Sequence, residues 1–236
     1  MEIVYGINPI AELLKANRRG IINLYSSDPH RLALLEKKSG ISPLKAKFED
    51  RNKLVMISGS RHHQGVVAEV EDYPYSEVDE LFKNPNKFIL VLDDLTDPQN
   101  VGAILRSAYC AGVSGIVLRS HHSVNINSTV CKASAGAVEH LLISLVSNQS
   151  SFLDNAKEEG FLICALDMEG TSIFKEKLPF KRPIVLIVGA EDSGVKSILK
   201  KKCDLLLKIP MKGELDSLNA SAASAIALFE ISRRRS

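Results

Sequence analysis

Short apolar runs recur along the last two thirds of this 236-residue chain, and their spacing constrains the fold more than any other feature. Segments with helical periodicity lie between most of them. The runs cover residues 88–92, 115–118, 141–146, 161–166, 184–188 and 205–209. Brief apolar runs suit strands that are buried on both faces, and an intervening helix suits a parallel connection. The pattern therefore predicts an α/β domain with a largely parallel sheet.

The first 75 residues have a different pattern, in which short helices and strands alternate. Asn8, followed by Pro9, is placed to cap a helix. The pattern also predicts strands at 21–25 and 65–71 and a helix at 31–38. Turn-forming residues interrupt the periodicity at 72–76 and again at 84–86. We therefore expect a small domain over residues 1–75, a linker over 76–86 and a larger domain over 87–236.

Charge and composition favour no special class of protein. The formal net charge is +2, and residues 1–75 hold 11 Lys and Arg against 9 Asp and Glu, so the excess positive charge lies in the small domain. No apolar run is long enough to span a membrane and the N-terminus does not resemble a secretory signal, so a cytoplasmic location is expected. The four cysteines and the paired histidines lack the spacing of disulfide frameworks or metal sites, so no metal is expected.

Three segments that follow apolar runs carry the residues best suited to chemistry: 93–106, 189–194 and 210–219. In parallel α/β sheets, ligands bind in the crevice beyond the carboxyl ends of the strands, so these segments are expected to meet at one edge. No G-x-G-x-x-G motif follows the predicted strand at 88–92, and the sequence contains no P-loop motif. Ordinary dinucleotide or nucleoside triphosphate binding is therefore not favoured.

Within these segments, residue types point to an adenosine-like ligand and a phosphate. Asn100 is placed to begin a helix after Pro98, which would put Arg106 in the second turn. A guanidinium there could bind a phosphate in a bidentate way. Gly189 permits close approach of the backbone, and the stretch from Ile209 offers an apolar wall beside free backbone groups.

The three segments resemble, in the same order, the motifs of the SpoU/TrmH family of SPOUT methyltransferases. The first motif corresponds to Asn100, Gly102 and Arg106, the second to Gly189, Glu191 and Gly194, and the third to Ser217 through Ser221. Members of this family transfer a methyl group from S-adenosylmethionine to a ribose 2′-hydroxyl of RNA. The front region, with its 5–9 and 63–65 segments, resembles the family's substrate-binding domain, a small α/β domain of ribosomal-protein-like type.

The resemblance implies more than periodicity could. It implies a C-terminal α/β-knot domain, in which the chain forms a deep trefoil knot, and a homodimer whose site includes residues of both subunits. It implies S-adenosyl-L-methionine as cofactor and RNA as partner, with no metal and no membrane. The match is greatest to the RlmB-like group, which implies a guanosine in the peptidyl-transferase loop of 23S rRNA as target.

Residue roles follow from the resemblance as well. The implied catalytic residues are Asn100, Arg106, Glu191, Ser217 and Asn219. The implied cofactor-binding residues are Gly189, Glu191, Ile209, Met211, Ser217 and Leu218. A further family segment near the site resembles Lys132, Ser134 and Gly136. Because arginine stays protonated, Arg106 is expected to position the target electrostatically rather than to act as a base.

Two alternatives stay open on the sequence. The motifs specify the reaction better than the target, so the substrate could instead be tRNA or another rRNA position, although the small front domain favours rRNA. The chain could also be a catalytically silent RNA-binding paralogue that serves ribosome assembly. The presence of Asn100, Arg106, Glu191 and Asn219 together favours the enzyme.

Overall fold

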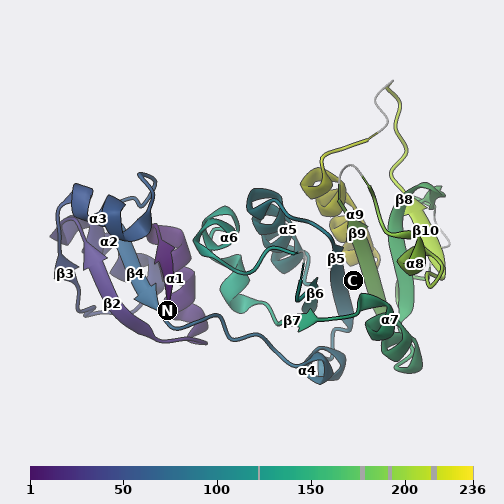
Figure 1. Cartoon of the computed structure of the whole chain (residues 1–236), viewed down its shortest axis with the longest axis horizontal. Coiled ribbons are helices and arrows are strands. Elements are labelled where there is room, and N and C mark those ends of the chain that lie inside the picture. Colours follow the sequence, from purple (N-terminus) through teal and green to yellow (C-terminus); the bar gives the residue numbers. More distant parts are fainter. Residues whose placement is uncertain (122, 176–178, 191–192, 214–216, 236) are drawn as a thin grey trace. The chain divides into compact units, whose positions relative to one another are not determined.

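The computed structural model describes residues 1–121, 123–175, 179–190, 193–213 and 217–235 (Figure 1). The chain forms two compact units. The first consists of Met1–Pro74 together with Asn125–His140, and the second of Tyr75–Val124 together with Leu141–Ser236. The apolar pattern assigns residues 125–140 to the larger domain, whereas the structure places them in the smaller unit. The physical reason is that residues 125–140 form long-range contacts with residues 1–74, among them the buried Arg19–Glu139 ion pair.

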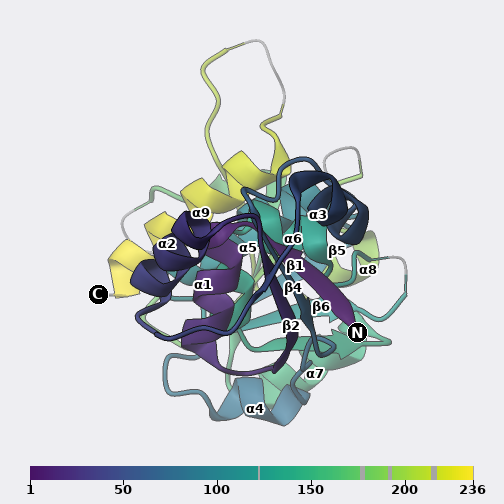
Figure 2. The same ribbon diagram turned by 90° about the vertical axis from the view of Figure 1, so that its left-hand side faces the viewer.

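The first unit is a four-stranded sheet with helices. Its elements in chain order are β1 (Glu2–Tyr5), α1 (Ile7–Ala16), β2 (Ile21–Ser26), α2 (Pro29–Ser39), β3 (Lys47–Phe48), α3 (Arg51–Ser58), β4 (Val66–Val70), α6 (Ser128–Ala133) and η1 (Ala137–His140). The strand order is β1-β4-β2-β3, with β4 antiparallel to both of its neighbours. Figure 2 shows α1 and α2 side by side. The strands and the helix predicted over 21–71 are confirmed.

The start of α1 differs from the prediction that Asn8 caps it. The helix begins at Ile7, and Gly6 occupies the N-cap position with φ of 96° and no capping side chain. The side chain of Gln64 supplies the missing acceptor, because its Oε1 accepts a hydrogen bond from Ile7 N at 3.1 Å. Asn8 Oδ1 instead accepts a hydrogen bond from Lys38 Nζ. A contact between residues so far apart in sequence could not be read from local pattern.

A buried ion pair joins residues 125–140 to the rest of the first unit. Arg19 and Glu139 have side chains that are 1% and 2% exposed, and two hydrogen bonds of 3.0 and 2.6 Å connect them. The Arg19 guanidinium also lies 5.4 Å from the ring centroid of Tyr73, whose hydroxyl donates to Val138 O at 3.0 Å. Although burial acts to lower the pKa of Arg19, its bonds with Glu139 raise that pKa, so the guanidinium stays charged.

A second buried group, His63, shapes the turn before β4. The residue is 4% exposed, and Nδ1 accepts a hydrogen bond from Gly65 N at 3.0 Å. Burial, followed by the nearby charges of Arg51 and Lys132, lowers the pKa of His63 below its ordinary value. The imidazole is therefore neutral at pH 7, with its proton on Nε2.

This depressed pKa predicts that acid weakens the first unit. The unfolded pKa is about 6.5, so the stabilising contribution is complete above that pH and is lost as the pH falls through the folded-state value. We expect amide exchange in β4, corrected for intrinsic rates, to lose protection as the pH falls below 6.5. His63→Asn should remove most of that dependence, while substitution of the exposed neighbour, His62→Gln, should preserve it. An unchanged dependence in His63→Asn would assign it to another group.

The second unit is built on a six-stranded, wholly parallel sheet with the order β10-β8-β9-β5-β6-β7. Its strands are β5 (Phe88–Asp93), β6 (Gly115–Arg119), β7 (Ile143–Val146), β8 (Leu162–Ser172), β9 (Ile184–Gly189) and β10 (Leu205–Lys208). Its helices are α4 (Val78–Lys83), α5 (Pro98–Cys110), α7 (Gln149–Glu158), α8 (Ser197–Lys200) and α9 (Ala220–Arg235). All six predicted strands are confirmed, and so is the parallel α/β class.

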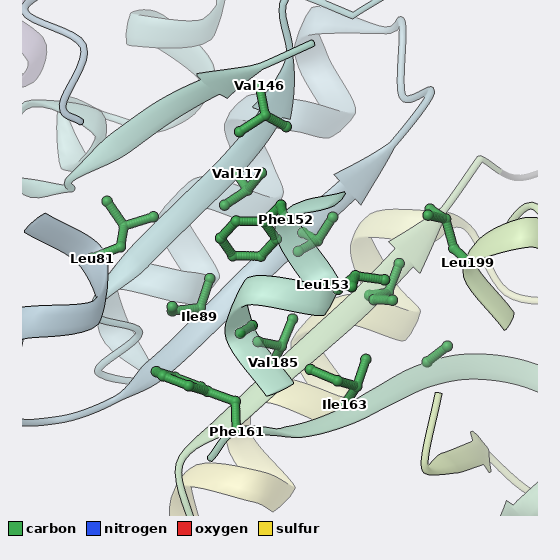
Figure 3. Close-up of a cluster of buried hydrophobic side chains, with 14 of the residues drawn as sticks. Leu81, Ile89, Val117, Val146, Phe152, Leu153, Phe161, Ile163, Val185 and Leu199 are labelled. Carbon is green, nitrogen blue, oxygen red and sulfur yellow. The ribbon is translucent and has the colours of Figure 1, made fainter. Parts of the chain in front are cut away.

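The core of the second unit explains the continuous apolar runs in its central strands, which end at Asp93 in β5 and at Gly189 in β9. Every residue of β5 is buried because helices cover both faces of the sheet. Figure 3 shows α7 with Phe152 and Leu153 packed on one face against Ile89 and Val185, while α9 lies behind the strands. A strand covered on both faces cannot alternate polar with apolar residues, which is the reason for the continuous runs.

Residues 76–86 are not merely a linker. They contain α4, in which Leu81 is fully buried and packs into the same core as Phe152. The ring of Phe82 stacks on that of Phe152 with centroids 5.6 Å apart. Gly115 leaves room for this helix, since a Cβ there would lie 2.6 Å from Leu81 Cγ. The turn-forming residues around α4 obscure its short apolar stripe. None of the helices in the described parts of the chain is long and apolar enough to span a membrane.

Candidate cofactor and RNA site

A cavity of about 700 Å³ lies at the carboxyl ends of β8, β9 and β10. Five of the residues implied as cofactor contacts line it: Gly189, Ile209, Met211, Ser217 and Leu218. The sixth, Glu191, lies outside the described residues. Parallel strands bring their carboxyl ends to one edge, so segments that are distant in sequence meet there, as the sequence pattern predicts.

After β9, the backbone at Gly194 and Val195 lies very close to Gly189. A Cβ on Gly189 would lie 2.1 Å from the carbonyl carbon of Gly194, a distance that no side chain tolerates. The loop is closed by a hydrogen bond of 2.8 Å from Gly194 N to Ala190 O, and Gly194 has φ of 61°. The first glycine is therefore required by close backbone approach and the second by its left-handed conformation.

A buried carboxylate holds the far end of this loop. Asp93, at the end of β5, is 1% exposed, and its Oδ2 accepts a hydrogen bond from Lys196 N at 2.9 Å. Burial raises the pKa of Asp93, against the opposing effect of Lys196. The next residue, Asp94, pairs with Lys196 and with Arg119. Although burial acts to raise it, these hydrogen bonds lower the pKa of Asp94. Sequence reasoning did not identify this acidic pair, whose only signal is its place after an apolar strand.

A second acidic group missed by sequence reasoning lies on the cavity itself. Asp167 and Glu169 line it within an irregular part of β8. Asp167 is 7% exposed at its side chain, forms an ion pair with Lys200, and accepts a hydrogen bond from Glu169 N at 2.9 Å. Burial opposes the effect, but the hydrogen bond to Lys200 lowers the pKa of Asp167. This carboxylate is therefore ionised at the cavity wall.

The N-terminus of α5 differs from the prediction that Asn100 begins the helix. Asp97 is the N-cap, and its carboxylate accepts hydrogen bonds from Gln99 N and Asn100 N at 3.0 and 3.2 Å. Pro98 is the first helical residue, where its missing N–H is not needed. Arg106 consequently lies in the third turn, one turn later than predicted.

Asn100 and Asn219 bring the first and third motifs together. Asn219 caps α9, since its Oδ1 accepts a hydrogen bond from Ser221 N at 2.9 Å. Its Nδ2 donates to Asn100 Oδ1 at 3.1 Å, which links the starts of α5 and α9. Asn219 follows Leu218, a residue of the cavity wall. The amide pair is thus fixed beside the cavity by the chain itself.

Arg106 occupies a different environment from the other candidates. Its side chain is exposed on α5 and does not line the cavity. Among the described residues it has no hydrogen-bond or ion-pair partner, in contrast to Arg19 or Arg119. An exposed guanidinium without an internal partner is available to a phosphate from outside the chain.

Lys132, Ser134 and Gly136 lie in the first unit. Lys132 Nζ donates to Gln64 Oε1 at 3.1 Å, and the buried Ser134 hydroxyl donates to Cys131 O at 3.1 Å. A Cβ on Gly136 would lie 2.9 Å from the Cα of Pro9, so α1 passes very close. These contacts assign the segment a packing role, and its role in the reaction stays a prediction. In the described ranges, no group of three His, Cys, Asp or Glu residues could hold a metal.

Comparison with known proteins identifies the family. Residues 87–229 match the SpoU rRNA methylase family, and residues 3–76 match the RNA 2′-O ribose methyltransferase substrate-binding family. The chain is 36% identical over 245 residues to YacO of Bacillus subtilis (strain 168), assigned to the TrmH family of tRNA/rRNA methyltransferases; the match covers 99% of this chain and 96% of YacO.

Two solved structures have the same fold. The SpoU methyltransferase AviRb from Streptomyces viridochromogenes, in complex with AdoMet, gives a TM-score of 0.82 at 24% identity and covers 99% of this chain and 90% of AviRb. An AdoMet-bound rRNA methyltransferase from Sinorhizobium meliloti gives 0.81 at 25% identity, with 99% and 87% covered. The family matches, supported by these likenesses, show that this chain belongs to the SpoU/TrmH family of RNA methyltransferases.

Proposed function

We propose that this chain transfers the methyl group of S-adenosylmethionine to a ribose 2′-hydroxyl of RNA, with a guanosine in the peptidyl-transferase loop of 23S rRNA as its target. One observation carries the proposal. The cavity at the ends of β8, β9 and β10 lies beside the Asn100–Asn219 pair, so a cofactor site and a polar constellation occur together. The tRNA/rRNA family assignment of YacO leaves tRNA as the competing substrate.

The cavity fits S-adenosylmethionine in size and in chemistry. Its volume is within the range of sites for small organic ligands. Ile209 and Leu218 offer apolar surface for an adenine ring, and the missing side chain of Gly189 exposes backbone groups. The Asp167 carboxylate could accept hydrogen bonds from ribose hydroxyls. No metal is required by this donor set.

The residues of the chain have to position the RNA rather than generate a strong nucleophile. S-adenosylmethionine supplies an already activated methyl group. A ribose hydroxyl reacts with it only when held in line and shielded from water. We assign this alignment to the Asn100–Asn219 pair and to the Ser217 hydroxyl on the cavity wall. Arg106 binds the phosphate of the target nucleotide, and Glu191 belongs to the same proposed set.

We further propose that the working form is a cytoplasmic homodimer. The adjacent helices α5 and α9 expose large apolar side chains, with Ile226 38%, Phe229 50% and Tyr109 43% exposed. Exposed apolar side chains on adjacent helices are typical of a surface that another protein covers. A second copy seated there would bring another α5, and with it another Arg106, next to a cavity that this residue does not line.

The apolar face of α9 gives a direct prediction. Phe229→Glu places a charge in the proposed interface, so we expect the chain to sediment as a monomer and to lose methyl transfer. Lys212→Glu, an exposed substitution outside these helices, should leave the dimer intact. Sedimentation velocity at several protein concentrations measures the oligomeric state of both variants, and transfer of labelled methyl to RNA measures their activity. A wild-type chain that is monomeric at all concentrations would contradict the homodimer.

The function itself is tested by transfer of labelled methyl from S-adenosylmethionine to unmodified 23S rRNA, 16S rRNA and tRNA. Linkages that resist alkali locate a 2′-O-methyl group. We expect label in 23S rRNA alone, at a guanosine. Label in tRNA or in 16S rRNA would contradict the target but not the reaction. Cofactor binding with no transfer to any free RNA, or to immature ribosomal particles, would favour a silent RNA-binding paralogue.

Arg106→Ala separates positioning of RNA from binding of the cofactor. Loss of one preorganised cationic contact is expected to lower kcat about a hundredfold. Because Arg106 does not line the cavity, the dissociation constant for S-adenosylmethionine should not change. Steady-state kinetics and calorimetry measure the two quantities, with Arg182→Ala as the control at another arginine of the second unit. Parallel loss of both quantities would indicate a folding defect instead.

A further inference from the structure

The first unit contains a second cavity, of about 600 Å³, that carries three arginines: Arg31, Arg51 and Arg61. They come from the start of α2, the start of α3 and the turn that follows α3. His63 and Gly65 complete the wall beside them. The cavity therefore collects three positive charges from separate elements of a unit whose sequence is only slightly basic.

These guanidiniums are not bonded to carboxylates in the described parts of the chain, although Arg31 interacts electrostatically with the nearby Asp28 carboxylate. Across the described ranges, none of the three guanidiniums forms an ion pair or a hydrogen bond. The nearby acidic residues Asp28 and Asp50 are engaged as N-caps, with their carboxylates accepting hydrogen bonds from Arg31 N and Lys53 N at 2.9 Å. Arginines used only for folding usually have an acidic or carbonyl partner, as Arg19 does.

His63 adds a polar atom to the wall of this cavity. The residue is 4% exposed and lines the cavity, and its Nδ1 is occupied by Gly65 N at 3.0 Å. Within the structure as described, Nε2 has no partner. With Nδ1 fixed as an acceptor, Nε2 carries the proton and is a donor. An N–H donor at the cavity wall, beside three guanidiniums that form no hydrogen bond, suits an external acceptor with negative charge.

Gly65 keeps the arginine side chains close to this histidine. Its φ is 83°, and a Cβ would lie 2.9 Å from Arg31 Cγ and 2.6 Å from Ser27 Oγ. The stem of Arg31 therefore lies against the backbone of the turn. The donors of the cavity are held by a fixed turn and by two helix starts rather than by a flexible loop.

We propose that this cavity binds a backbone phosphate of the RNA substrate, at a site separate from the target ribose. Guanidinium forks match phosphate oxygens in a bidentate way, and a neutral N–H donor adds a contact without further charge. The inference rests on the proposed function, because it takes RNA as the ligand. It assigns the first unit a defined anchoring site for the polynucleotide.

The test compares two double variants with equal loss of charge. Arg51→Gln/Arg61→Gln alters the cavity, while Lys37→Gln/Lys45→Gln removes two exposed charges of the same unit that do not line it. The dissociation constant for an unmodified 23S rRNA fragment is measured over a salt series. The cavity variant should bind about tenfold or more weakly, with the slope of log K against log salt reduced by about 0.7 to 0.9. The loss should appear in KM for RNA rather than in kcat.

Each outcome decides something different. Equal weakening by both double variants would show a diffuse basic surface and overturn the site, as would wild-type affinity in the cavity variant. Failure of the wild-type chain to bind any RNA would overturn this inference together with the proposed function. RNA binding that depends on the cavity, without methyl transfer, would support the site and contradict the enzymatic activity alone.

His63 supplies a finer test. His63→Asn retains an acceptor near the position of Nδ1 but lacks a donor at Nε2, whereas His63→Gln retains a donor near Nε2. We expect His63→Asn to weaken RNA binding severalfold more than His63→Gln does, with amide protection in β4 showing that both variants fold. Equal affinities would limit His63 to shaping the turn.

Discussion

Replacing Gly189 with alanine is expected to abolish cofactor binding while the core of the second unit stays folded. The added Cβ would lie 2.1 Å from the carbonyl carbon and oxygen of Gly194 and 2.4 Å from Val195 N. These are backbone atoms, which cannot rotate away as a flexible side chain would. The loop from Ala190 must therefore open, and the hydrogen bond from Gly194 N to Ala190 O is lost. Since Gly189, Ala190 and Gly194 all line the cavity, its shape changes.

Calorimetry with S-adenosylmethionine measures this effect. We expect no measurable binding to Gly189→Ala at cofactor concentrations that saturate the wild-type chain. Gly213→Ala is the matched control, because it adds the same atom to the same cavity wall with nothing within 4 Å. Hydrogen exchange should show β5 and β9 protected in both variants. Near-wild-type affinity in Gly189→Ala would mean that the cofactor does not use this cavity.

The sheet of the second unit could be predicted from sequence for a simple physical reason. Burial on both faces favours continuous apolar runs, as in β5 before Asp93 and in β9 before Gly189, and such runs are visible without any knowledge of tertiary contacts. The short apolar stripe of α4 lies between turn-forming residues, so its burial against Phe152 was not evident. The local sequence pattern shows which residues can be buried, but it does not always show which elements they pack against.

The candidate site was predictable only where residues follow strands. The edge that gathers Gly189, Ile209 and Leu218 follows from parallel strand direction. The hydrogen bond between Asn100 and Asn219 joins residues 119 positions apart, so only the resemblance to a family placed them together. Asp93 and Asp167 belong to no recognised motif, and their importance became visible only from their burial and partners. The trefoil knot stays a prediction of that resemblance.

The Arg19–Glu139 pair is expected to determine whether residues 125–140 stay attached to the first unit. Glu139→Ala leaves the Arg19 guanidinium buried without its bidentate partner. Removing one member of a buried ion pair costs about 3–5 kcal/mol in unfolding free energy. That is a large part of the stability of a small domain. The double variant Arg19→Met/Glu139→Leu removes both buried charges and should recover most of the loss, because the other carboxylate that pairs with Arg19, that of Glu2, is partly exposed to solvent.

A thiol reports this change directly. Cys131 is 1% exposed, and burial raises its pKa, so it should resist alkylation in the native chain. In a Cys110→Ser background, which removes the exposed thiol, we expect Glu139→Ala to make Cys131 react at least a hundredfold faster. Asp72→Ala, which removes an exposed ion pair of the same unit, should change unfolding by less than about 1 kcal/mol and leave Cys131 protected. A Cys131 that stays unreactive in Glu139→Ala would show that packing by Tyr73 and α1 is sufficient, and that the ion pair adds little to the attachment.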